Sequence, residues 1–219
     1  VTVSAFEAGD LPISITASGA VTGNAVYWVI EPDGNTAPNA TEIVAGQASG
    51  GGSPAESGTE NWPGPFTDTL TTGLARGDYK LYAVIVNAGG NSNVGTSAAF
   101  EVDTTAPSLS SPTSSALTQT TATVTVTSND TVGTLYWGVY PTASTPTAAQ
   151  IIAGTGATDS GSTASPAAST NDFSATGLTG STAYKAHFVQ VDDYANQSSV
   201  ATSAEFTTSS GSITLSAVG

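Results

Sequence analysis

Few side chains in this sequence could carry acid–base or nucleophilic chemistry. The 219 residues include one histidine, His187, and no cysteine, so a Ser-His-Asp arrangement has one possible base and a thiolate nucleophile is excluded. His187 lies between Ala186 and Phe188 in an alternating segment, and we expect it to be a sheet-face side chain. No nucleophile elbow, phosphate-binding glycine loop or zinc-ligand spacing occurs. The sequence therefore predicts a protein that is not an enzyme.

A second kind of site would bind a hard cation through oxygen ligands. Asp192, Asp193 and Asn196 fall in one loop, and Asp103 could add further oxygens, which are the ligands that Ca²⁺ takes. Adjacent strand residues point to opposite faces, which argues against Asp192 and Asp193 as the carboxylate pair of a glycoside hydrolase. We expect no cofactor, and Ca²⁺ is the one cation that these four residues suggest. The alternative is an ordinary surface loop.

A third candidate site would bind carbohydrate through an exposed aromatic ring. Trp62 follows Asn61 in a segment rich in glycine and proline, and an aromatic ring beside an amide is a suitable surface for a sugar. Two Tyr-Trp pairs, at 27–28 and 136–137, offer further aromatic rings. Because side chains alternate along a strand, one member of each pair must face the core. Trp62 and Asn61 therefore remain the predicted glycan contact.

Composition excludes several other partners. Lys and Arg total 3 and Asp and Glu total 17, so the net charge is −14, and the basic surface of a nucleic-acid-binding protein is missing. No run approaches the length of apolar sequence that a membrane helix needs, so we expect no membrane insertion. Charged residues make up only 9% of the chain, against about 25% in ordinary globular domains. That balance suits an extracellular or virion β protein.

The elements that must position these residues occur twice. Three segments of the first half reappear in the second half, in the same order and at nearly constant spacing. The Tyr-Trp pair at 27–28 matches 136–137, residues 43–46 match 151–154, and residues 96–100 match 202–206. We therefore expect two copies of one domain, at 1–103 and 104–208, with 209–219 as a terminal strand or the start of a further unit.

Within each copy the hydrophobic pattern is that of β-strands. In residues 121–127, Ala122, Val124 and Val126 alternate with threonines, as in a half-buried antiparallel strand. Residues 38–44 and 146–152 could form a helical turn or two. By composition, residues 46–65 and 154–170 are long loops.

One sheet of each copy is predicted to be apolar on both faces. The outer face carries Tyr82, Val84 and Val86 in the first copy and His187, Val189 and Val191 in the second. A free sandwich normally exposes polar residues on its outer face, so something must cover these six. The two candidates are the long loop of the same copy and a neighbouring protein subunit, in which case the six residues form an interface.

The segment Gly-Leu-Thr-Gly-Ser-Thr-Ala-Tyr at 177–184, with the strand after it, resembles the E–F corner and F strand of fibronectin type III domains. Their tyrosine corner uses a buried Tyr hydroxyl to bind backbone upstream. Leu178 and Tyr184 have its spacing, whereas Leu74 and Tyr79 are one residue closer. The buried Trp of strand B is missing in this chain, and Trp28 and Trp137 lie instead on strand C, as in immunoglobulin domains.

The Asp-Thr-Thr-Ala-Pro linker at 103–107 and the repeated segments also look like repeats of bacterial surface proteins and tailed-phage structural proteins. The resemblance implies an all-β chain of two tandem Greek-key β-sandwiches, fibronectin type III or immunoglobulin-like. It further implies a non-catalytic structural or display module of a virion, such as a decoration, fibre or tail-associated protein, that contacts other protein subunits. The alternative is a bacterial cell-surface adhesin or carbohydrate-binding accessory module that contacts host glycans.

Overall fold

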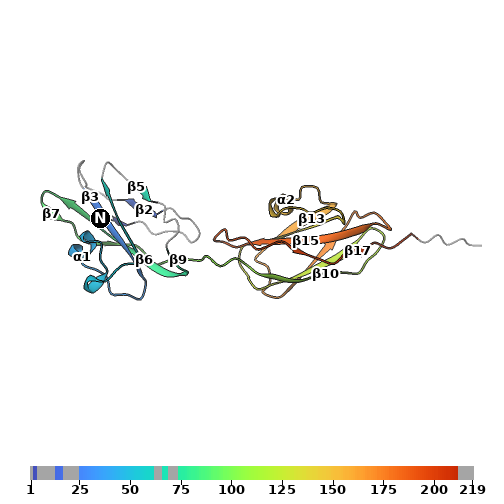
Figure 1. Ribbon diagram of the computed structural model, residues 1–219, viewed down its shortest axis with the longest axis horizontal. Coiled ribbons are helices and arrows are strands. Elements are labelled where there is room, and N and C mark those ends of the chain that lie inside the picture. Colours follow the sequence, from blue (N-terminus) through green and yellow to red (C-terminus); the bar gives the residue numbers. More distant parts are fainter. Residues whose placement is uncertain (1, 4–12, 17–24, 62–65, 69–73, 212–219) are drawn as a thin grey trace, which may run out of the picture. The chain divides into compact units, whose positions relative to one another are not determined.

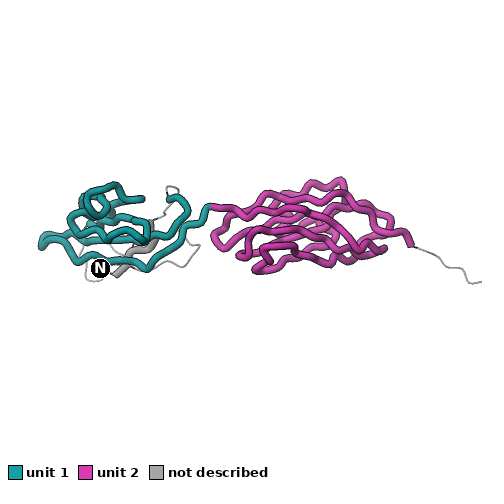
Figure 2. Tube along the Cα trace, turned by 90° about the horizontal axis from the view of Figure 1, so that it is seen from below, with its two compact units in different colours: residues 1–104 teal, residues 105–219 magenta. Residues whose placement is uncertain are grey.

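The computed structural model describes residues 2–3, 13–16, 25–61, 66–68 and 74–211. The chain divides into two compact units, Val1–Thr104 and Thr105–Gly219 (Figure 2). This division lies one residue from the expected 103/104 boundary. Most of the predicted terminal strand at 209–219 lies outside the described residues.

The first unit contains two antiparallel sheets. The smaller has the order β1-β2-β5, and the larger has β4-β3-β6, with β7, β8 and β9 all pairing with β6. The strands are β1 (Thr2–Val3), β2 (Ile13–Thr16), β3 (Ala25–Pro32), β4 (Glu56–Asn61), β5 (Phe66–Asp68), β6 (Gly77–Asn87), β7 (Gly90–Asn91), β8 (Gly95–Thr96) and β9 (Phe100–Val102).

The second unit repeats this arrangement (Figure 1). Its sheets have the orders β10-β11-β14 and β13-β12-β15-β16, and β17 also pairs with β15. The strands are β10 (Leu109–Ser115), β11 (Ala122–Ser128), β12 (Thr134–Pro141), β13 (Asp159–Ala164), β14 (Thr170–Ala175), β15 (Ala183–Val191), β16 (Ala201–Thr202) and β17 (Phe206–Thr207). Every strand pair is antiparallel, so the predicted all-β sandwich fold is confirmed.

The core of each unit is built from alternate residues of the facing strands. In β11, Ala122, Val124 and Val126 are buried, while the threonines between them are half-buried. These residues pack with Trp137 of β12 and Phe188 of β15. The prediction that one aromatic of each Tyr-Trp pair faces the core is confirmed: Trp28 and Trp137 are in the core, and the neighbouring tyrosines lie on the outer face.

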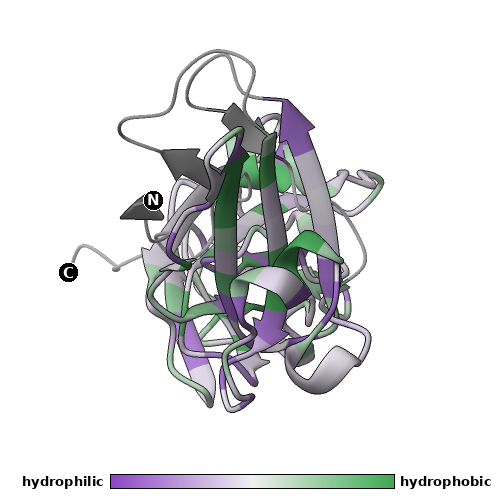
Figure 3. Ribbon diagram, turned by 90° about the vertical axis from the view of Figure 1, so that its left-hand side faces the viewer, coloured by the Kyte–Doolittle hydropathy of each residue, from purple (hydrophilic) through white to green (hydrophobic). Residues whose placement is uncertain are grey.

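A short helix covers the outer face of the larger sheet in each unit. The helices α1 (Ala40–Val44) and α2 (Ala148–Ala153) begin at capping boxes, in which the side chains of Asn39 and Thr147 accept backbone N–H groups. Each inserts one isoleucine, Ile43 or Ile151, into a second cluster on that face. Figure 3 shows a helix lying across strands with long hydrophobic segments. The predicted helical turns are thus confirmed. In the described part of the chain, no helix is long and apolar enough to cross a membrane.

The prediction that residues 46–65 and 154–170 are long loops is wrong. Each segment contains an edge strand, β4 or β13, that pairs along its full length with β3 or β12. A 3-10 turn, η1 (Ser49–Gly51), precedes β4. Ser, Thr and Gly make up most of β13 and half of β4, and neither strand contains a large apolar residue.

Candidate functional site

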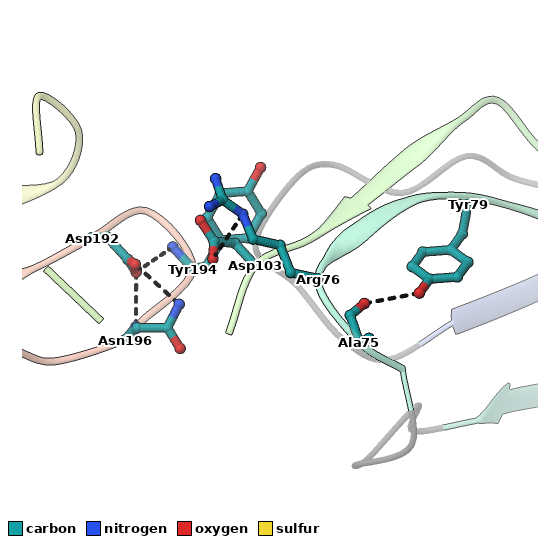
Figure 4. A network of polar contacts seen from close by, with 7 residues as sticks. All are labelled: Ala75, Arg76, Tyr79, Asp103, Asp192, Tyr194 and Asn196. Atoms are coloured by element: carbon teal, nitrogen blue, oxygen red, sulfur yellow. Dashed lines mark hydrogen bonds and ion pairs between the residues drawn. The ribbon is translucent and has the colours of Figure 1, made fainter. Parts of the chain in front are cut away.

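Both tyrosine corners predicted from the sequence are present. In the first unit the Tyr79 hydroxyl donates a hydrogen bond to the Ala75 carbonyl at 2.9 Å (Figure 4). In the second the Tyr184 hydroxyl accepts one from the Thr179 backbone N–H at 3.0 Å. The corner is therefore kept in both units although its hydrogen bond runs in opposite directions. Its role is structural, because each bond joins the start of a central strand to the backbone before it.

Asp192, the main residue of the predicted calcium site, instead closes a turn. Its Oδ1 accepts hydrogen bonds from the backbone N–H groups of Tyr194 at 2.9 Å and Asn196 at 2.7 Å, and its Oδ2 accepts one from Asn196 Nδ2 at 3.0 Å (Figure 4). The residue is only 5% exposed. A carboxylate with these donors is satisfied by the protein itself. Its place in the turn explains why an acid is buried here.

The other predicted calcium ligands do not complete a cation site. Asp193 is exposed, and Asp103 belongs to the first unit, where it forms an ion pair with Arg76 at 3.4 Å (Figure 4). Among the described residues, no group of three or more His, Cys, Asp or Glu side chains lies close enough to hold a metal ion. The structure therefore gives the calcium prediction no support.

His187 is a buried residue of the outer face, as the sequence predicted. It is 5% exposed, its Nδ1 lies 3.0 Å from the Thr202 hydroxyl, and its ring meets Tyr140 edge-on at 5.4 Å. Its Nε2 is buried without a hydrogen-bond partner in the described chain. Burial lowers the pKa of His187, and the nearby positive charge of Lys185 lowers it further. Both effects favour the neutral form of the ring.

The outer-face residues predicted as an interface lie beneath the helices of their own units. Tyr82 and Val84 are buried with Val29 and Ile43, and Val86 packs beside them while half-buried. In the second unit Val189 is buried with Ile151, and half-buried Val191 packs beside it. The sequence left two candidates for the cover of this face, the long loop and a neighbouring subunit, and the structure shows neither of them there. The cover is α1 or α2.

The predicted glycan contact is described only in part. Asn61 is exposed at the end of β4, whereas Trp62 lies outside the described residues. That contact remains a prediction.

Sequence reasoning missed Glu31, a charged residue that is 2% exposed on the outer face of β3. Its Oε2 accepts a hydrogen bond from Asn35 Nδ2 at 2.9 Å, while Oε1 is buried without a partner in the described chain. Tyr140 occupies the matching position of the second copy. A signal was present in the repeat alignment, because an acid aligned with a tyrosine on a covered face is unusual.

The features that both copies keep are packing features. A glycine of the edge strand lies opposite each core tryptophan, Gly58 opposite Trp28 and Gly161 opposite Trp137. A buried serine of each copy accepts a backbone N–H of the central strand at 2.9 Å: Ser97 accepts that of Leu81 and Ser203 that of Ala186. A second serine does the same, Ser92 for Ile85 at 3.0 Å and Ser198 for Gln190 at 2.9 Å.

No protein-family model and no curated protein matches this chain. Among solved structures, it is similar to the chicken CNTN1 FN1–FN3 domains, with a TM-score of 0.51 and 11% identity over 95% of this chain. The chain spans 63% of the length of that structure.

Two further similar structures have lower TM-scores. The fibronectin(III)-like modules of Clostridium thermocellum CbhA match with a TM-score of 0.39 and 17% identity, over 95% of this chain and 90% of theirs. The chicken interferon gamma receptor alpha chain matches with a TM-score of 0.35 and 8% identity, over 90% and 92%. The strand order, the two tyrosine corners and the CNTN1 match together show that the chain folds as tandem fibronectin type III-like β-sandwiches.

Proposed function

We propose that the protein is a non-catalytic structural or display module of an extracellular assembly, and specifically a decoration, fibre or tail-associated component of a tailed-phage virion. The observation that carries the proposal is the contrast between what the two copies share and what they do not. Tryptophan–glycine pairs, tyrosine corners, buried serines and capped helices occur in both. The candidate chemical residues His187, Asp192 and Glu31 each occur in one copy only.

Three positions illustrate this contrast. His187 aligns with Tyr82, Asp192 with Asn87, and Glu31 with Tyr140. A duplicated catalytic or metal site would need the same side chains in both copies, because the chemistry depends on them. A duplicated spacer or display module needs only the same scaffold. The repeat therefore favours architecture as the common function, in a virion or at a cell surface.

The free strand edges are the surfaces that other protein subunits would bind. β4 and β13 end the strand order of their sheets, so one edge of each has no strand partner within the described residues. β13 contains a single charged residue, Asp159. An edge with unpaired N–H and C=O groups and few charges is a template for pairing with another chain.

Light scattering of the purified chain over a range of concentrations tests this proposal. We expect a discrete multimer that Ser162→Lys weakens, because a lysine on an edge strand opposes pairing. Ala168→Lys adds the same charge at an exposed position outside the strands and serves as the matched control. A monomer at every concentration, or equal effects of both lysines, would overturn assembly through this edge.

The second candidate function is that of a cell-surface adhesin or carbohydrate-binding accessory module. It is favoured by the exposed position of Asn61 at the end of β4, next to Trp62 in the sequence. A glycan array comparing the native chain with Trp62→Ala tests it. Glycan binding that is unchanged in Trp62→Ala would rule out a carbohydrate site at Trp62.

A further inference from the structure

The first unit has a polar pocket of about 310 Å³ on the helix-covered side of its larger sheet, lined by Glu31, Asn35, Thr36, Ala48 and Ser49. Glu31 comes from the end of β3, Asn35 and Thr36 from the turn after it, and Ala48 and Ser49 from the start of η1. The Glu42 carboxylate of α1 accepts the Gly50 backbone N–H at 2.7 Å, which ties η1 to the helix. This bond holds η1, which contributes Ser49 to the lining, beside α1.

Glu31 is the one charged residue in this lining, and its charge is not balanced. Oε1 has no hydrogen-bond partner in the described part of the unit, and the only partner of Oε2 is the neutral Asn35 amide. Lys80 lies directly opposite on β6, but its ammonium group forms an ion pair with Asp33. A buried carboxylate with a free oxygen is costly unless a donor or a positive charge reaches it.

The second unit provides an internal comparison at the same place in the fold. Tyr140 replaces Glu31, and its hydroxyl donates a hydrogen bond to the Gln150 carbonyl at 3.3 Å. The corresponding pocket, lined by Tyr140 and the matching turns, measures about 140 Å³. In the second unit the tyrosine narrows the pocket, and its hydroxyl has a hydrogen-bond partner. In the first unit the pocket is larger, and it lies beside a carboxylate oxygen without a partner in the described chain.

We propose that this pocket binds a primary ammonium group, with the Glu31 carboxylate as its counter-ion and the oxygen atoms of Asn35, Thr36 and Ser49 as further acceptors. An ammonium carries one positive charge and three N–H donors, which matches one carboxylate among neutral oxygens. A divalent metal matches less well, because the pocket supplies a single carboxylate and the described residues contain no group of three or more His, Cys, Asp or Glu side chains that could hold a metal ion. The pocket lining also lacks an aromatic ring, the usual partner of a quaternary ammonium.

Two sources present such a group, a free amino sugar and a lysine side chain of another protein. The chain's net charge of −14 favours either by raising the local concentration of cations. This inference is independent of the proposed structural function, since it concerns one unit and one pocket.

The test is a two-dimensional amide NMR titration of the full chain in about 0.15 M salt, where loose ion pairing at the surface is largely screened. Butylammonium chloride represents the lysine side chain, and glucosamine hydrochloride represents the amino sugar. We expect saturable shifts at Glu31, Asn35 and Ser49 but not at Ser144 and Thr155 of the second unit. For so small a ligand, a dissociation constant on the order of 1–10 mM is expected.

Tetramethylammonium chloride has the same charge and no N–H donor, and we expect it to bind at least about tenfold more weakly. Because that comparison uses the native chain, it does not depend on the folding of any variant. Equal shifts with both cations, or no saturable shift with either amine, would overturn the proposal. The amine with the lower dissociation constant shows whether a lysine side chain or an amino sugar is the better ligand.

Substitutions then assign the counter-ion. Glu31→Gln removes the charge and should abolish saturable binding, and Glu31→Tyr should do the same by copying the second unit. Asp78→Asn makes the same change of charge at an exposed residue of β6, and we expect it to leave binding unchanged. Binding that survives Glu31→Gln in a chain with native amide dispersion would place the ammonium elsewhere.

Discussion

The glycine opposite each core tryptophan should tolerate a side chain to different degrees in the two units. A Cβ atom at Gly58 would lie 2.4 Å from Trp28 Cζ2 and 2.6 Å from Cε2. At Gly161 the closest approach, to Trp137 Nε1, would be 3.0 Å. The same substitution, glycine to alanine, therefore creates a severe clash in the first unit and only a tight contact in the second.

The expected energies follow from these clearances. Overpacking a core with one extra methyl group costs about 1–3 kcal/mol, and the 2.4 Å contact belongs at the upper end. Replacing a strand glycine by alanine returns about 0.5–1 kcal/mol, because the unfolded chain loses conformational freedom. Gly58→Ala should therefore destabilise the first unit by about 2 kcal/mol, whereas Gly161→Ala should be close to neutral in the second.

Native-state hydrogen exchange of the full chain, read by mass spectrometry, measures each unit separately. About 2 kcal/mol corresponds to exchange that is about 30-fold faster in peptides of β3 and β6, with β12 and β15 unaffected as the control. Gly161→Ala should leave all four strands near their native rates. Equal losses in the two units, or native protection in Gly58→Ala, would refute the argument from tryptophan clearance.

Three further predictions concern single residues. Tyr79→Phe removes the hydrogen bond to the Ala75 carbonyl and should destabilise the first unit by about 1 kcal/mol in a urea titration; a native midpoint would contradict a structural role for that hydroxyl. Asp192→Ala removes the acceptor of three hydrogen bonds and should destabilise the second unit by about 2–4 kcal/mol, while millimolar Ca²⁺ leaves the native melting temperature unchanged. A rise in that temperature with Ca²⁺ would restore the calcium hypothesis. Burial and the charge of Lys185 lower the pKa of His187 on folding, so the unfolded chain binds the proton more readily than the folded chain. The free energy of unfolding should therefore fall as the pH drops below about 6.5, and it should level off below the folded-state pKa. His187→Tyr should remove the contribution of His187 to the pH dependence of the urea midpoint. Identical pH curves for the native chain and this variant would disprove that contribution.

The parts of the fold that sequence could predict are those encoded by local patterns. Alternation in residues 121–127 predicted the core strand that the structure places at 122–128. The repeat predicted a boundary at 103/104, one residue from the division between the two units, and the Leu–Tyr spacing predicted both corners. The edge strands β4 and β13 were missed because their residues bury little and have low strand propensity. Their pairing is determined by the neighbouring strand, which offers backbone groups along its whole length, and by glycines that leave room for a tryptophan.

The candidate sites were harder to predict, because polar roles depend on what covers a surface. Asp192 looked like a cation ligand, but three donors brought to it by the turn satisfy its oxygens. No prediction was made for Glu31, which alternation places on the outer face of β3. Only the position of α1 and η1 shows that this face is closed and that the carboxylate lies within it.

The helix that covers the outer face links the scaffold to the pocket. Strands with apolar residues on both faces need a cover, and α1 and α2 supply one within each unit. A helix of five or six residues cannot cover the whole face, so a space remains at the end of β3 and of β12. The residue at that position, Glu31 or Tyr140, determines which groups the space can bind. Tyr140 narrows that space to about 140 Å³, and its hydroxyl donates a hydrogen bond to the Gln150 carbonyl. Beside Glu31 the space measures about 310 Å³, and one carboxylate oxygen is buried without a partner in the described chain. The first unit therefore keeps a buried carboxylate with an unpaired oxygen that a bound ammonium group would satisfy, and this asymmetry is the reason to look for a ligand there and not in the second unit.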